Sequence, residues 1–352
     1  MTGTKTSQGN FFDDFRLGQT IVHPVPRTIT EGDATLYTAL YGSRFAVQSS
    51  RTFAASIGLP AAPVDDWLSF HVVFGKTVSD ISLNAVANLG YADGRFGVPV
   101  YPGDTLATVS EVIGLRESAK GDSGVVYVRS VGRNQRGETA VSYVRWVLLP
   151  KRDQAAPAPM TVVPALPQAV PVGELSVPSG LELSRYDTAL AGSPSLWDDY
   201  AVGERIDHVD GLTIEEAEHM LATRLWQNAA RVHFNGQAAK ASRFGRRLIY
   251  GGHVISLARA ISFNGLANAF KVASLNGGRH VAPTFAGDTI YAWSEILEKH
   301  AFPTRDDVGA LRIRTIAAKD QPCSEFPDLA SDGKPHPAVV LNLDYTALMP
   351  RR

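Results

Sequence analysis

Two short segments in the second half of the chain carry the residue types best suited to chemistry. His233 ends the loop 227–233, and its imidazole is the only side chain of that loop that titrates near neutral pH. Gly251 and Gly252 directly precede an apolar stretch, 253–267, whose hydrophobic residues recur at helical spacing. Glycines at a helix start let a ligand approach unpaired backbone N–H groups, which stabilise an enolate-like oxygen. The pattern indicates acid–base chemistry beside an oxyanion site.

The sequence around these segments occurs twice. FFDDFRLGQTIVH (11–23) resembles LWDDYAVGERIDH (196–208) at an offset of 185 residues, and VPVYPGDTLATVSEV (98–112) resembles APTFAGDTIYAWSEI (282–296) at an offset of 184. A register held over most of both halves indicates two copies of one fold.

The repeat predicts the domain organisation. We expect an N-terminal domain at 1–150, a Pro- and Ala-rich crossover linker at 151–195, and a C-terminal domain at 196–352. The linker is weakly periodic, so we expect it to be extended rather than packed. A long connection is expected if the two copies pack as a pseudo-dimer.

Only the second copy holds both chemical groups. The corresponding loop of the first copy, 42–48, has Ser43 and Gln48, neither of which titrates usefully near pH 7. Asp65 and Asp66 stand at its helix start, where a carboxylate caps the helix but repels an oxyanion. We therefore predict a degenerate first site and a catalytic second site.

Each copy is expected to contain two helices followed by strands. The helices are predicted at 30–42, 67–81, 213–228 and 253–267. Thr213 and Glu216 have the spacing of a capping box for the third of these. The remaining runs are rich in β-branched and aromatic residues, which is typical of strands. The pattern predicts an α+β unit whose antiparallel sheet wraps round a helix, with the two sheets continuous or back to back.

Composition limits the function classes. The chain has 352 residues, with 34 Lys and Arg against 35 Asp and Glu, which argues against a nucleic-acid protein held by bulk charge. The single cysteine, Cys323, excludes an intrachain disulfide and fits the cytoplasm. No secretory signal or membrane span is predicted. No metal is expected, because no ligand spacing occurs, and no redox cofactor, because no G-x-G-x-x-G follows a strand.

This order of elements, with its Gly-Asp-Thr turn between strands, resembles the MaoC-type enoyl-CoA hydratase family. The resemblance implies a double hotdog, two tandem units of the family's hotdog fold. The family's loop reads roughly G-D-x-N-P-x-H, and its Asp and His are the acid–base pair that adds water to an enoyl thioester. His233 falls on the motif His, and Asn228 falls on the motif Asp, a departure. The family's helix-start glycine, which binds the thioester oxygen, corresponds to Gly252, with Tyr250 and Gly251 beside it.

Because Asn228 stands where the family has an Asp, the motif does not identify the second group that transfers a proton. An amide cannot take a proton, so Asn228 would either hold the attacking water or only cap the loop. His233 would then act alone, or a carboxylate would come from elsewhere. The candidates are Glu31, Asp33, Asp65, Asp66 and Glu218, most of which are expected as helix caps.

The longer runs RLWQNAARVHFNG (224–236) and SRFGRRLIYGGHVISLARA (242–260) resemble the mesaconyl-CoA hydratase subfamily, also called β-methylmalyl-CoA dehydratases. The resemblance implies reversible hydration of mesaconyl-C1-CoA (2-methylfumaryl-CoA) in the ethylmalonyl-CoA pathway. Coenzyme A is then part of the substrate, and no separate cofactor is needed. We expect an acyl-CoA as the small-molecule ligand and leave a homodimer open.

Arginines are the candidates for the anionic parts of such a substrate, because guanidinium groups suit carboxylates and phosphates. Arg231, in the catalytic loop, and Arg44, in its degenerate counterpart, are candidates for the free carboxylate, with Arg231 preferred. Arg243, Arg246 and Arg247 precede the Gly-Gly helix start and are candidates for the CoA phosphates. Each of them could equally be a solvated loop residue.

Three other functions remain open at this point. A MaoC-type hydratase for another enoyl-CoA would not need the arginines. A hotdog acyl-CoA thioesterase would release the free CoA thiol. A non-catalytic acyl-CoA binding protein would fit the loss of the motif Asp, although His233 and the glycine pair argue against it.

Overall fold

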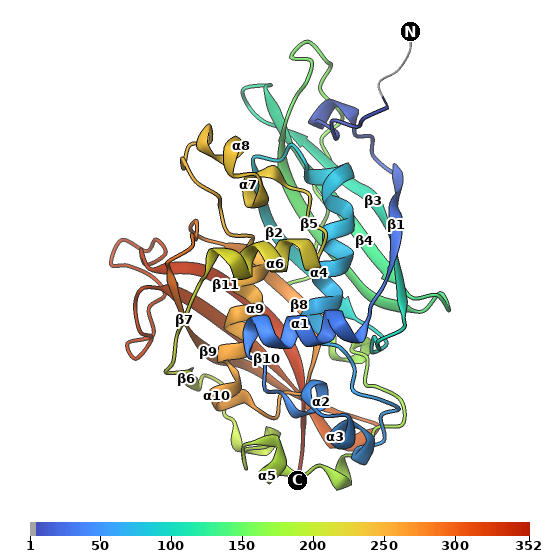
Figure 1. Ribbon diagram of the computed structural model, residues 1–352, viewed down its shortest axis with the longest axis vertical. Helices are drawn as coiled ribbons and strands as arrows, with labels where there is room; N and C mark the ends of the chain where they lie inside the picture. Colours follow the sequence, from blue (N-terminus) through green and yellow to red (C-terminus); the bar gives the residue numbers. More distant parts are fainter. Residues whose placement is uncertain (1–4) are drawn as a thin grey trace.

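One antiparallel sheet runs through both halves of the protein (Figure 1). The structure is a computed structural model and describes residues 5–352. Within that part the sheet has eleven strands, and its order is β1-β3-β4-β5-β2-β8-β11-β10-β9-β6, with β7 pairing with β9. The strands are β1 (Thr20–Thr28), β2 (Ala87–Phe96), β3 (Thr105–Glu117), β4 (Ser123–Arg133), β5 (Thr139–Pro150), β6 (Arg205–Asp207), β7 (Leu212–Thr213), β8 (Lys271–His280), β9 (Thr289–Phe302), β10 (Arg305–Lys319) and β11 (Val339–Pro350).

The two halves meet where β2 pairs with β8, so the sheet is continuous and not two layers back to back. Tyr91 lies opposite Gly278, and Gly94 lies opposite Leu275. Each large side chain faces a glycine of the other strand, and a Cβ on either glycine would come within 3.3 Å of that partner side chain. The glycines therefore make room for a close junction.

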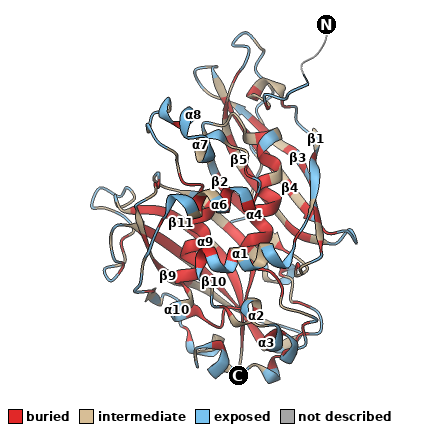
Figure 2. Ribbon diagram, viewed as in Figure 1, coloured by how far each residue is buried: buried red, intermediate tan, exposed pale blue. Residues whose placement is uncertain are grey.

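Two long helices, α4 (Asp66–Thr77) and α9 (Gly251–Ile261), pack against one face of the sheet and against each other. Figure 2 shows them as the most buried helices of the molecule, and every residue of α9 after Gly251 is buried. The amphipathic helices α1 (Glu31–Tyr41) and α6 (Glu216–Leu225) contact each other over them (Figure 1). One hydrophobic core includes residues of both halves. The four predicted helices are confirmed.

Short helices occupy the connections. They are α2 (Ala46–Ser49), α3 (Arg51–Ser56), α5 (Thr188–Ala191), α7 (Arg231–Phe234), α8 (Gly236–Lys240) and α10 (Phe263–Leu266), with one π-helical turn (Val78–Ser82) after α4. Of the described residues, no helix combines the length and the hydrophobicity that crossing a membrane requires.

The predicted capping box of Thr213 and Glu216 is wrong. Thr213 belongs to β7, where its hydroxyl bonds that of Thr289 at 2.8 Å, and α6 begins only at Glu216 without a side-chain cap. Thr213 pairs with Thr289 at the edge of the sheet, and Glu216 forms an ion pair with Arg247. A local capping preference is weaker than strand pairing with β9 at this position.

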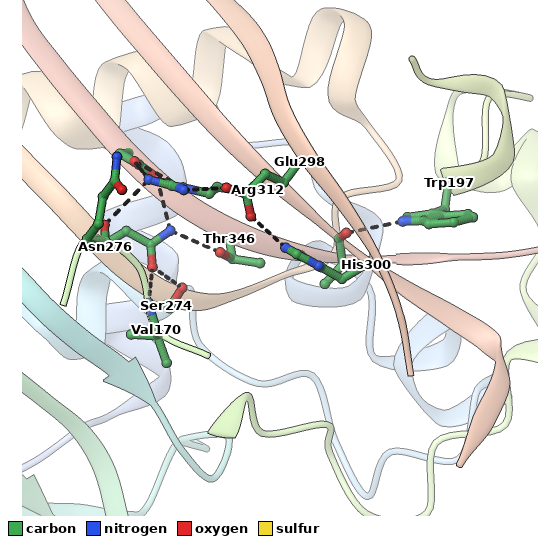
Figure 3. A network of polar contacts seen from close by, with 11 residues as sticks. Val170, Trp197, Ser274, Asn276, Glu298, His300, Arg312 and Thr346 are labelled. Carbon is green, nitrogen blue, oxygen red and sulfur yellow. Dashed lines mark hydrogen bonds and ion pairs between the residues drawn. The ribbon is translucent and has the colours of Figure 1, made fainter. Parts of the chain in front are cut away.

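The connection 151–195 differs from the expected unpacked linker. It has little regular structure, but it covers a second core cluster, in which Leu175, Leu181 and Leu183 are buried. A polar network on the second half of the sheet holds it in place (Figure 3). Asn276 accepts the N–H of Val170 at 3.0 Å, and Arg312 forms an ion pair with Asp344, which itself bonds Asn276.

Candidate active site

His233 lies on α7, and one hydrogen bond fixes its protonation pattern. Nδ1 donates to the carbonyl of Leu248 at 2.8 Å, so the neutral ring carries its lone pair on Nε2. The backbone N–H of Leu248 donates to Val232 in return, at 3.0 Å, which ties the loop to the segment that leads into α9. Burial lowers the pKa of His233 to about 4, against the opposing effect of the Leu248 carbonyl. The imidazole is therefore a neutral acceptor at pH 7.

Aromatic rings enclose His233 on the side of the core. The ring of Tyr250 lies 5.5 Å from it and that of His219 lies 6.2 Å away, measured between centroids. The N–H of Tyr250 donates to Nε2 of His219 at 2.9 Å, which fixes the start of α9. The hydroxyl of Tyr250 is buried and has no hydrogen-bond partner within the described residues. A buried hydroxyl without a partner is available to a ligand.

The N-terminus of α9 presents free donors beside this ring. His253 donates its N–H to the carbonyl of Tyr250 at 2.9 Å, whereas the N–H groups of Gly251 and Gly252 have no acceptor in the described part of the chain. A Cβ on Gly252 would lie 2.6 Å from the ring of His71, and one on Gly251 would lie 2.3 Å from the ring of His280. The glycines thus serve both close packing and access to the helix dipole.

Asn228 lies in the loop after α6, between that helix and α7, and is buried. Its Oδ1 accepts the N–H of Ala230 at 3.0 Å, which is the loop-capping role. Its Nδ2 has no partner within 5–352 and remains free to donate to a water or a substrate. Oδ1 of Asn228 is therefore occupied by the hydrogen bond from Ala230, and Nδ2 is the atom that remains for binding.

Most of the carboxylates considered as a second base have structural partners. Asp65 caps α4 by accepting the N–H of Trp67 at 2.8 Å, and its burial raises its pKa to about 6. The other pairs are Asp66 with Lys271, Asp33 with Arg27 and Glu31 with Arg51. Glu218 alone of the five has no ion pair or hydrogen bond in the described part, but it lies on α6, one residue before His219. In the described part, no hydrogen bond or ion pair joins any of the five to His233.

Sequence reasoning missed His280, which stands at the end of β8. Its ring packs on Gly251, and its Nε2 lies 3.3 Å from the hydroxyl of Tyr91 on β2. Burial lowers the pKa of His280 to about 4, and His233 adds to the lowering. His253, in the first turn of α9, is buried, and its Nδ1 bonds the hydroxyl of Tyr41 on α1 at 2.9 Å.

The predicted arginines separate into three groups. Arg231 is exposed on α7, two residues before His233. Arg243 and Arg246 are exposed and stack on Phe244 and Phe285, whereas Arg247 is bound to Glu216. Arg44 stacks on Phe263, so the structure does not bring it to His233. Within the described residues, no group of three or more His, Cys, Asp or Glu side chains is arranged to hold a metal ion.

The fold and site define a double hotdog of the MaoC-like type. A solved MaoC domain dehydratase from Chloroflexus aurantiacus matches with a TM-score of 0.97 at 66% identity, covering 99% of this chain and 100% of that one. A Mycobacterium tuberculosis protein described as a double hotdog matches with a TM-score of 0.73 at 23% identity, covering 97% of this chain and 99% of that one. The second likeness concerns the fold alone, and the predicted fold is confirmed.

The chain belongs to the mesaconyl-CoA hydratase family, whose model matches residues 2–325. It is 66% identical to the β-methylmalyl-CoA dehydratase of Chloroflexus aurantiacus, over 99% of both chains. It is 59% identical to the mesaconyl-CoA hydratase of Cereibacter sphaeroides, over 99% of this chain and 100% of that protein. The predicted family and the prediction of a hydro-lyase are confirmed.

Proposed function

We propose that this protein catalyses the reversible hydration of mesaconyl-C1-CoA to β-methylmalyl-CoA at the site in its second half. The activities after which its relatives are named support the substrate. The observation that carries the proposal is the placement of His233. A neutral imidazole with its lone pair on Nε2 lies near the start of α9, where two N–H groups have no acceptor among residues 5–352.

The chemistry follows from this geometry. The N–H of Gly252, supported by Gly251, binds the thioester oxygen and draws electron density from the C2–C3 double bond. Nε2 of His233 takes a proton from water as the oxygen of that water bonds to C3. The resulting enolate collapses when C2 takes a proton back from the imidazolium, so one water is added in total. The reverse sequence dehydrates the product.

Asn228 and Tyr250 complete the site in this proposal. The free Nδ2 of Asn228 donates a hydrogen bond to the attacking water, while Oδ1 keeps the loop closed. The hydroxyl of Tyr250, which has no partner among the described residues, is proposed to bind the substrate. His233 then performs both proton transfers, because no carboxylate stands at the position of the motif Asp.

The exposed guanidinium groups of Arg243 and Arg246 are proposed to bind CoA phosphates. Both stack on phenylalanines, which holds them in place before the phosphates arrive. Arg247 supports them less directly, since Glu216 already neutralises it. Sequence reasoning assigned the substrate carboxylate to Arg231 or Arg44, and the stacking of Arg44 on Phe263 leaves Arg231 as the better candidate of the two.

The cellular setting is also part of the proposal. We place the enzyme in the cytoplasm and in the ethylmalonyl-CoA pathway of acetyl-CoA assimilation, on the resemblance and on the single buried cysteine, Cys323. A homodimer is the proposed assembly, and sedimentation equilibrium of the purified protein tests it.

One experiment separates the candidate functions. The purified protein is incubated with mesaconyl-C1-CoA while the absorbance of the conjugated enoyl thioester and the amount of free thiol are followed. Hydration removes the absorbance without releasing thiol, whereas a thioesterase releases thiol. Binding without either change identifies an acyl-CoA binding protein. Faster turnover of crotonyl-CoA than of mesaconyl-C1-CoA would identify a hydratase for another enoyl-CoA and contradict the proposed substrate.

A further inference from the structure

His280 and Tyr91 form a polar pair that crosses the junction between the two halves. Their side chains come from β8 and β2, and the Tyr91 hydroxyl lies 3.3 Å from Nε2 of His280. The two rings are perpendicular, at 89°, with centroids 5.9 Å apart. Tyr91 is 2% exposed, and Gly278 opposite it leaves room for its ring. The pair is thus built from both copies of the repeat.

The pair lies at the candidate active site. A Cβ on Gly251 would lie 2.3 Å from both Cε1 and Nε2 of His280, so the imidazole contacts the first turn of α9 directly. His233 reaches the same turn from the loop side, next to Tyr250. A thioester bound at the N–H groups of the glycines would therefore lie close to both imidazoles.

The repeat shows that both members of the pair are special to the second site. With Pro99 aligned to Pro283, His280 corresponds to Phe96 and Tyr91 corresponds to Leu275. Phe96 packs on Trp67 near the start of α4, just as His280 packs on Gly251 at the start of α9. The degenerate site therefore has two apolar side chains where the other site has an imidazole and a phenol.

The proposed substrate places a second anion close to this turn. Its free carboxylate is bonded to C3, the carbon that receives water, so it must lie near His233 and near the start of α9. Burying a carboxylate without donors is costly. Arg231 is exposed on α7, and Arg243 and Arg246 are exposed and already stack on phenylalanines.

We propose that His280 and Tyr91 bind the free carboxylate of the substrate, with the imidazole and the phenol as its hydrogen-bond donors. This inference rests on the proposed function and replaces Arg231 in that role. Tyr91 can turn its hydroxyl from Nε2 to the carboxylate, and the imidazole donates from a ring nitrogen. A charged ligand at this position also favours the imidazolium form, which strengthens the contact. The first half thereby supplies a specificity residue to the second site.

The test compares two unreactive ligands that differ only at this group. Methylsuccinyl-C1-CoA has the carboxylate, and 2-methylbutyryl-CoA has a methyl group in its place. Calorimetric titration gives the affinity of each for the wild type, His280→Leu, Tyr91→Phe and Arg231→Met. We expect His280→Leu to reduce the preference for the carboxylate ligand at least about tenfold, which corresponds to about 1.4 kcal/mol. Tyr91→Phe, which keeps the ring and its packing, should reduce it by a few fold.

The control is His300→Gln, since His300 pairs with Glu298 in the network of Figure 3, away from α9, and should leave the preference unchanged. A wild type without a preference, an equal loss for both ligands in both variants, or a loss confined to Arg231→Met would overturn the inference. If His280→Leu does not fold, Tyr91→Phe decides alone. Turnover of mesaconyl-C1-CoA by the wild type is measured separately, so failure of the proposed function is recognised independently.

Discussion

Replacing His233 with glutamine tests the central element of the mechanism. Glutamine occurs at the corresponding position of the first copy, where Gln48 donates its amide to the carbonyl of Phe270 at 2.7 Å. The same amide can therefore replace Nδ1 of His233 as donor to Leu248. At most one hydrogen bond is weakened, and we expect a stability loss of about 1 kcal/mol or less.

The catalytic loss should be far larger than the structural one. A general acid–base group contributes about 10²–10⁴-fold, equivalent to about 3–5 kcal/mol of activation free energy. Glutamine keeps the donor to Leu248 but has no lone pair that can take a proton near pH 7. Because the pKa of His233 is lowered to about 4, its neutral form outweighs the protonated form about a thousandfold at pH 7. The wild type should thus show a flat kcat/KM from pH 8 down to about pH 5.

The assay follows the enoyl-thioester absorbance of mesaconyl-C1-CoA for both proteins, with circular dichroism and thermal melting as folding controls. We expect a folded variant whose melting temperature changes by a few degrees and whose kcat/KM falls at least about a hundredfold. A folded variant with turnover near that of the wild type would refute the assignment. A wild-type kcat/KM that already falls tenfold per pH unit below pH 6.5 would show that the base has an ordinary histidine pKa.

Three further outcomes are expected. Ser43→Ala and Gln48→Ala should leave kcat within a few fold of the wild type, because the first copy has carboxylates at the helix start where the second has free N–H donors. A loss as large as that of His233→Gln would show that the first site is catalytically active. Gly251→Ala should lower both turnover and melting temperature, since the added Cβ would lie 2.3 Å from the ring of the neighbouring histidine on β8; unchanged kinetics would disprove this close packing. Burial lowers the pKa of His219 to about 2 and that of His253 to about 3, so the unfolded chain binds more protons than the folded protein below pH 6.5. Each histidine should therefore remove about 1.4 kcal/mol from the free energy of unfolding per pH unit as the pH falls. Urea unfolding at pH 7 and pH 5 measures this loss, and equal stability at the two pH values would contradict it.

The sequence was informative about elements whose signal is local or repeated. The offset between the halves predicted two copies, and the spacing of apolar residues predicted the helices that became α4 and α9. Both follow from periodicity, which depends on residues close together in the chain. The same comparison located the change from Gln48 to His233 and from Asp66 to glycine.

Other expectations failed where a local preference met a tertiary contact. Thr213 does not cap α6, because it pairs with β9 as part of β7. The connection 151–195 packs on the sheet because Asn276 and Arg312 supply donors and acceptors for its backbone. None of these partners is near in sequence, so no local pattern could reveal them.

The sequence by itself determined the two-copy architecture, the family and the candidate base His233 with the glycines before α9. Only the tertiary structure decided which nitrogen of His233 is free, because that depends on the carbonyl of Leu248. It also decided that His280 and Tyr91 meet at the same helix start, since the pairing of β2 with β8 brings together residues 189 positions apart. The sequence determines which side chains are present, but the register between β2 and β8 determines which of them lie close enough to bind the same ligand.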